Sequence, residues 1–369
     1  MDINVAKRPF PLRGVHWSIA NRWIIGTRAR VFIVTPECVM AGDTREKREV
    51  SAALEATSSI EAVCLLEPLQ SSSSCNYDHA LGVLASDSSL RLFVPPIGGR
   101  PDYDNWVQVG CYRSPTAAGS SDLLCAIDCV PSGMATAAAA AAGKEEEVVV
   151  GAAACGFMSG RVEVVGLRVE NGGEIATKRA LDVDAGGGHA VCHVAWVDGG
   201  SSDRLLLLVC AVDGRAGLWQ IHRDLSQATL LATIGLQDWR PFTAHCVSSG
   251  RYLVLAKIGT AAVVDVGADS VPPTAIQYTA LGVSQTIISC VIDERRERIY
   301  VAAADFCIYV LSKQGDASWS RRLEEERALR DGMRKTVEKS FTTPFKMSSL
   351  VLRSLTLSPN ARYLAFAAE

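Results

Sequence analysis

The sequence predicts an all-β fold in which one antiparallel sheet unit is repeated around a ring. Short apolar runs, many of them β-branched, are separated by turns of Gly, Asp, Asn and Ser, which is typical of antiparallel meanders. The runs lack strict apolar–polar alternation, which indicates strands that are buried on both faces. The unit recurs along the chain, and radial stacking of such units protects most strand edges. A β-propeller explains all three observations; one β-sandwich or a pair of sandwiches is the alternative.

Four units repeat regularly. Each has an apolar strand, a short polar turn and a second apolar strand, and they occupy residues 80–94, 204–221, 249–266 and 298–311. In the second of these the strand RLLLLVCA is followed by the turn VDGR and the strand AGLWQI. We expect Trp219, on the last of these strands, to be a core anchor.

Three further units are less regular and lie at 15–34, 123–165 and 355–368. Aligning all the units gives seven anchor positions: Trp23, Leu81, Val149, Leu205, Leu253, Ile299 and Leu364. Their mean spacing is about 57 residues, wider than the roughly 40–45 of compact WD40 blades, and insertions account for the excess. The prediction is a single domain over 1–369, a seven-bladed WD40-like β-propeller whose last blade is incomplete. We therefore expect the natural chain to continue past Glu369; an open or six-bladed ring is the alternative.

Three inserts are predicted to interrupt the blades. Residues 41–60 are charged and then rich in Ala and Ser, and residues 131–147 hold an alanine run followed by Gly-Lys-Glu-Glu-Glu. The second insert has the low complexity of a disordered loop. Residues 318–341 have the apolar spacing of an amphipathic helix.

Composition narrows the class of partner. The chain has 369 residues and a formal net charge of −3, so it is not a polycation that coats nucleic acid or an anionic membrane. No apolar run approaches the roughly 18 residues that a membrane span needs. The 12 cysteines include no CxxC pair and lie mostly in apolar runs. These cysteines indicate buried thiols in a reducing compartment. From the charge and the short apolar runs we expect no membrane partner.

The search for catalytic and metal motifs predicts no catalytic, cofactor-binding or metal-binding residue. No phosphate-binding loop, dinucleotide fingerprint or nucleophile elbow is present. His189, Cys192 and His193 come nearest to a metal site, but on a strand the two histidines lie about 13 Å apart. Isolated carboxylates at turns and strand ends are expected to cap turns. They are Asp213, Asp265 and Asp305.

The predicted helix within 318–341 is the best candidate for a partner-docking element. Leu329, Met333 and Val337 form an apolar stripe at i, i+4, i+8, and a dense mixed-charge face accompanies it. The candidate docking residues are these three together with Arg330 and Arg334. Two alternatives stay open: the stripe packs on the propeller's own flank, or the insert is a solvated spacer. DNA is a poor partner for this helix, because the acidic side chains of the helix would repel the DNA phosphates.

Several short motifs occur in an order that resembles one family. They are VHWSIANR at 15–22, ALGVLASDSSLRL at 80–92, WVQ at 106–108, VDGRAGLWQ at 212–220, TIISCVID at 286–293 and LTLSPNARYLA at 355–365. Together they resemble the N-terminal WD40-like propeller of the TFIIIC delta subunit, a part of the RNA polymerase III general transcription factor. The motifs cover much of the chain. The family's zinc-binding region lies in a C-terminal half that these residues do not match, so no metal is carried over.

The resemblance implies a scaffold subunit in a nuclear complex that recognises internal promoters of transfer-RNA genes. Its partners would be the other TFIIIC subunits and the polymerase III initiation factor, with DNA contact indirect or minor. An acetyltransferase activity is attributed to the family, but the sequence has no acyl-CoA loop, so that activity is not carried over. The rival hypotheses are a propeller scaffold of another complex, such as an adaptor, coat or ribosome-biogenesis factor, and an enzyme.

Overall fold

The structure is a computed structural model of the whole chain. It describes residues 15–17, 23–26, 31–34, 49–50, 59–66, 80–94, 106–115, 122–131, 148–169, 175–184, 187–197, 204–222, 225–235, 242–247, 251–266, 275–282, 285–313, 318–340, 350–358 and 360–368. All structural statements below concern these residues.

The strands form seven antiparallel sheets in chain order, six of four strands and one of two. We number the sheets as blades 1 to 7. Blade 1 holds β1 (Val15–Trp17), β2 (Trp23–Gly26), β3 (Val31–Val34) and β4 (Glu49–Val50). Blade 2 holds β5 (Ile60–Leu66), β6 (Ala80–Ala85), β7 (Ser89–Val94) and β8 (Val107–Tyr112). Blade 3 holds β9 (Leu124–Pro131), β10 (Val148–Phe157), β11 (Arg161–Val169) and β12 (Ile175–Asp184).

The remaining blades follow the same plan. Blade 4 holds β13 (Val191–Val197), β14 (Arg204–Ala211), β15 (Arg215–His222) and β16 (Ala228–Gly235). Blade 5 holds β17 (Ala244–Val247), β18 (Tyr252–Lys257), β19 (Thr260–Asp265) and β20 (Ala275–Ala280). Blade 6 holds β21 (Ile287–Asp293), β22 (Arg298–Ala303), β23 (Cys307–Ser312) and β24 (Ser320–Arg321), followed by helix α2 (Leu323–Ser340). Blade 7 holds β25 (Leu352–Leu357) and β26 (Leu364–Ala368).

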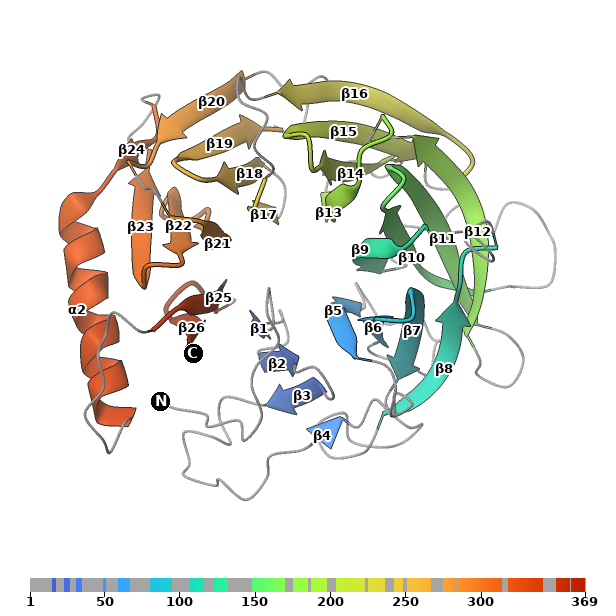
Figure 1. The fold of residues 1–369 in the computed structure, drawn as a ribbon, viewed down its shortest axis with the longest axis horizontal. Coiled ribbons are helices and arrows are strands. Elements are labelled where there is room, and N and C mark those ends of the chain that lie inside the picture. Colours follow the sequence, from blue (N-terminus) through green and yellow to red (C-terminus); the bar gives the residue numbers. More distant parts are fainter. Residues whose placement is uncertain are drawn as a thin grey trace.

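The blades stand around a ring, with the first strand of each blade innermost (Figure 1). Blade 7 lies beside blade 1, so seven blades circle the centre. This confirms the predicted seven-bladed β-propeller and rules out the six-bladed alternative. All seven predicted anchors fall on the second strand of a blade, where both strand edges are paired in the four-stranded blades.

Apolar clusters fill the spaces between neighbouring blades. Leu92 of blade 2 and Phe157 of blade 3 share one cluster, and Leu207 joins blade 4 to blade 3 in the next. The second strands β6 and β18 are buried along almost their whole length, because a blade packs on either side of them. This two-sided burial is the physical reason for apolar runs without alternation.

The predicted inserts are only partly described. Within 41–60, residues 49–50 form β4 and Ile60 opens β5, so this segment includes strands of blades 1 and 2. Residues 132–147, nearly all of the second insert, lie outside the described residues. The third segment begins with β24, the outer strand of blade 6, before the predicted helix starts at Leu323.

Trp219 is half-buried and packs against the cluster between blades 3 and 4. Its neighbour Leu218 is fully buried on the other face of β15. The indole lies over Gly217, where a Cβ atom would come within 2.7 Å of the Trp219 Nε1. Trp219 is therefore a flanking contact of the core, less buried than the sequence predicts.

Candidate protein-interaction face

The turns between the second and third strands lie at one end of the ring, because strand order and direction repeat from blade to blade. We call this end the turn face. In four blades the first turn residue donates its backbone N–H to the carbonyl of the residue just before the inner strand. The pairs are Ser86 to Ser59, Met158 to Leu123, Val212 to Ala190 and Ala304 to Thr286, at 2.8 to 2.9 Å. Each turn is thereby held against the inner strand of its own blade.

Carboxylates cap the turns of blades 2, 4 and 6. Asp87, Asp213 and Asp305 each accept the backbone N–H of the residue two positions further on, at 3.1 to 3.2 Å. This confirms that Asp213 and Asp305 cap turns, as their position after a strand predicts. Asp265 instead ends β19, at the opposite end of the ring, where it pairs with Arg251 at 3.3 Å.

Arginines pair with two of the capping carboxylates, Asp87 and Asp213. Asp87 accepts bonds from Arg91 at 2.9 Å and Arg113 at 2.6 Å. Burial alone would raise the pKa of Asp87, but the hydrogen bonds from Ser89 and these arginines lower that pKa to about 2. The pKa of Asp213 is also lowered, because its bonds from Arg215 outweigh the effect of burial. These carboxylates stay charged and paired at neutral pH.

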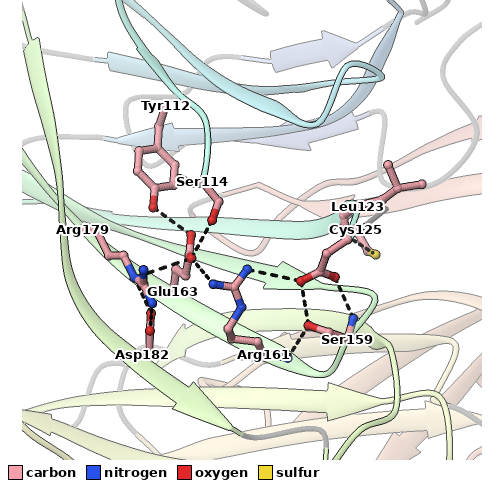
Figure 2. A network of polar contacts seen from close by, with 10 residues as sticks. Tyr112, Ser114, Leu123, Cys125, Ser159, Arg161, Glu163, Arg179 and Asp182 are labelled. Atoms are coloured by element: carbon pink, nitrogen blue, oxygen red, sulfur yellow. Dashed lines mark hydrogen bonds and ion pairs between the residues drawn. The ribbon is translucent and has the colours of Figure 1, made fainter. Parts of the chain in front are cut away.

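A buried carboxylate, Glu163 on β11, joins blade 3 to blade 2 (Figure 2). The hydroxyls of Tyr112 and Ser114, which come from blade 2, donate to its two oxygens at 2.7 Å each. Within blade 3, Arg161 donates to the same carboxylate, and Arg179 lies 3.5 Å from it. Burial and the neighbouring Glu163 raise the pKa of Tyr112, so its hydroxyl remains a donor. The group is an inter-blade clamp with its charges satisfied.

The clamp continues to the surface through Asp122. Its carboxylate accepts the backbone N–H of Ser159 at 2.9 Å and the Ser159 hydroxyl at 2.8 Å. Arg161 bridges Asp122, at 3.2 Å, to the buried Glu163 (Figure 2). Blade 3 thus caps its turn with a serine and a carboxylate from the preceding segment, in place of the single aspartate of blades 2, 4 and 6.

The predicted docking helix α2 packs its apolar stripe on the propeller. Met333 and Val337 are buried and Leu329 is half-buried in the cluster between blades 6 and 7. Arg330 and Arg334 are exposed, and Arg334 pairs with Glu338 at 2.7 Å. The propeller's own flank covers the stripe, which is one of the alternatives that the sequence left open. Among the described residues of α2, the charged side chains Arg330 and Arg334 lie on the side that faces away from this cluster.

The edge of β23 explains this packing. The inner edge of β23 is paired with β22, but on its outer edge the two-residue β24 pairs only with Leu311 and Ser312, so within the described part of the chain the rest of that outer edge has no neighbouring strand. Helix α2 lies along that edge, and its Glu326 accepts the backbone N–H of Val310 at 3.2 Å. The helix therefore takes the place of an outer strand, as proteins often do with an open edge.

The structure places His189 apart from Cys192 and His193 in the contacts that each makes. His189 lies in the turn face, 3.9 Å from Asp213, whereas Cys192 and His193 lie on a bulged part of β13 near the Phe242 carbonyl. No group of three metal-ligating side chains comes together among the described residues. No helix in the described part of the chain is long and apolar enough to cross a membrane.

Sequence reasoning missed the apolar side chains of the turn face. Leu123, Met158 and Val212 are 51%, 50% and 42% exposed, although each lies beside a buried strand. Met158 and Val212 occupy the same position in their turns, the first residue after the second strand. Aligning the turns as well as the strands would have found them.

Comparisons with known proteins identify the fold. No protein-family model matches the chain, and a search of curated protein sequences finds no match. Solved structures do match: a chain in the crystal structure of the mitotic checkpoint complex is 12% identical, with a TM-score of 0.54. That match covers 100% of this chain and 94% of the other chain.

Raptor from Chaetomium thermophilum is 11% identical, with a TM-score of 0.56. That match covers 98% of this chain, which spans only 27% of the Raptor chain. Both neighbours are WD40-type propellers. At such low identity the similarity shows the fold alone, and by fold this chain is a WD40-like β-propeller.

Proposed function

We propose that the chain is a non-catalytic scaffold subunit that holds other proteins of a complex together. The observation that carries this is the turn face, where exposed apolar side chains stand among arginines on a rigid ring. Apolar centres with arginine-rich surroundings are typical of protein–protein interfaces. The solved neighbours support the same role, since one is named as part of a multiprotein complex.

The complex that we propose is TFIIIC, the RNA polymerase III promoter-recognition factor, in the nucleus. This proposal rests on the motifs that resemble its delta subunit, four of which fall on strands and turns of the blades. ALGVLASDSSLRL and VDGRAGLWQ both include a turn between a second and a third strand, TIISCVID covers β21, and LTLSPNARYLA joins β25 to β26. Its partners are the other TFIIIC subunits and the polymerase III initiation factor, with DNA contact indirect or minor.

Affinity purification of the tagged full chain, with identification of the proteins recovered, tests this function. We expect the other TFIIIC subunits in amounts comparable to the chain. Recovery of subunits of an adaptor, coat or ribosome-biogenesis complex would assign the chain to that complex instead of TFIIIC. Acetyl-CoA-dependent activity that stays with the chain through rigorous purification would show that the chain is an enzyme and would contradict the non-catalytic role.

A further inference from the structure

The turn face of blades 3 and 4 carries exposed apolar side chains, which we call the blade 3–4 patch. Its apolar members are Leu123, Met158 and Val212. Leu123 and Met158 are joined by a backbone hydrogen bond of 2.9 Å, and Val212 is bonded to Ala190 at the same distance. The two turns lie close together across the blade border.

Packing at Gly156 shows that closeness. A Cβ atom on Gly156 would meet the Val191 side chain at 2.5 Å, so the end of β10 touches the start of β13. Met158 follows Gly156 by two residues, and Val191 follows Ala190, the partner of Val212. The exposed apolar side chains therefore stand on directly adjoining turns.

Basic groups border the patch on both sides and point to solvent more than the acids do. The side chains of Arg113, Arg215 and His189 are 65%, 58% and 52% exposed. The carboxylates that pair with the two arginines, Asp87 and Asp213, are less exposed, at 26% and 16%, and each also accepts a backbone N–H of its own turn.

Arg113 stands on the blade 2 side of the patch: its neighbours Tyr112 and Ser114 bond Glu163 of blade 3, and its own side chain pairs with Asp87 in the turn of blade 2. Asp182, at the edge of the same network, is paired with Arg179. In the pairs Arg113–Asp87 and Arg215–Asp213 the arginine is thus the more exposed partner, although the chain as a whole is slightly acidic.

We infer that the blade 3–4 patch binds an acidic segment of a partner protein that also carries apolar side chains. Leucine-sized side chains of the segment would bury Leu123, Met158 and Val212, and its carboxylates would face Arg113 and Arg215. A nucleic acid fits less well, because its phosphates would meet apolar side chains at the centre of the patch. The inference rests on the proposed scaffold function and names the chemistry of one partner.

A binding titration of the full chain tests the inference. The probe is a fluorescent synthetic peptide in which glutamates alternate with leucines, followed by anisotropy. We expect saturable binding that weakens at least about tenfold when lysine replaces glutamate or serine replaces leucine. Added salt should weaken it further, since exposed charges are screened.

Matched variants locate the binding. Met158→Ser and Arg215→Ala should each weaken binding about tenfold. Leu230→Ser and Arg251→Ala should leave it unchanged, because Leu230 lies on the outer strand β16 and Arg251 at the opposite end of the ring. Absence of saturable binding overturns the inference. So does an equal loss in the control variants, or preference for a single-stranded DNA probe over the peptide.

The same variants in affinity purification separate this inference from the proposed function. If Met158→Ser and Arg215→Ala chains recover every TFIIIC subunit in full amount, the patch inference fails and the scaffold function stands. If the unchanged chain recovers no subunit while the peptide still binds at the patch, the scaffold assignment fails and the patch stands.

Discussion

At the scale of single residues, Gly82 on β6 makes room for two thiols. The Cys64 and Cys129 sulfur atoms, from the inner strands of blades 2 and 3, lie 3.0 Å apart in the core. A Cβ atom on Gly82 would come within 2.6 Å of the Cys64 Sγ and 3.2 Å of the Cys129 Sγ. The absence of a side chain at Gly82 therefore decides how closely the two blades meet.

Gly82→Ala should lower the free energy of unfolding by about 1–3 kcal/mol, the usual cost of overpacking a core. Urea unfolding measures it, and adding Cys64→Ala to the same chain should recover part of the loss. Gly235→Ala is the control, because no atom lies within 4 Å of its Cβ position. Equal stability of the Gly82 and Gly235 variants would contradict the tight sulfur packing.

Asp87 makes the free energy of unfolding depend on pH in the acidic range. Its pKa is about 2 in the folded chain, against an ordinary value of 3.8, so the unfolded chain binds the proton at higher pH. The stability that Asp87 contributes is full above the ordinary value and is lost as the pH falls toward 2. Asp87→Asn should flatten the pH dependence of urea unfolding in this window. An unchanged slope would show that Arg91 and Arg113 do not hold the carboxylate.

At the scale of elements, helix α2 shows what a periodic pattern predicts and what it leaves undecided. The spacing of Leu329, Met333 and Val337 predicted both the helix and its apolar stripe. The spacing could not show which surface buries the stripe. That surface includes the outer edge of β23, which is open because β24 is only two residues long. An amphipathic pattern identifies a buried face without identifying the surface that buries it.

Met333→Asp should lower the free energy of unfolding by several kcal/mol, because it places a charge in the cluster between blades 6 and 7. Thermal melting gives the comparison, with Arg334→Asp on the exposed face of the same helix as control. A Met333→Asp chain that melts like the control and loses one subunit in affinity purification would restore the stripe as a docking surface.

Gly332 weakens the same helix. No atom lies within 4 Å of its Cβ position, the residue is exposed, and it stands inside an 18-residue helix. Gly332→Ala should therefore raise the free energy of unfolding by up to about 1 kcal/mol. Urea unfolding of the two chains measures the difference, and a loss of stability would mean that the helix is strained at this position.

The turns show a second limit of sequence reasoning at this scale. Turn composition predicted the capping by Asp213 and Asp305, because that bond is local. Glu163 gave no such signal, since its partners Tyr112 and Ser114 lie 51 and 49 residues away and meet it only when blades 2 and 3 stack. Long-range polar clamps depend on the assembled ring.

At the scale of the whole molecule, strand periodicity predicted the ring and its seven blades. The repeat is visible because blades such as 2, 5 and 6 bury the same second strand on both faces. The proposed function is less visible, because we place it on the turn face, where loop residues from different blades adjoin.

Occupancy of transfer-RNA genes by the chain in its own cells tests the scaffold proposal most directly. Chromatin immunoprecipitation of the tagged chain measures it, with genes transcribed by RNA polymerase II as the comparison. The account predicts enrichment over the internal promoters of transfer-RNA genes, and retention of that enrichment by the Arg251→Ala control. A chain that folds and assembles with other proteins but shows no enrichment at these promoters would contradict the account.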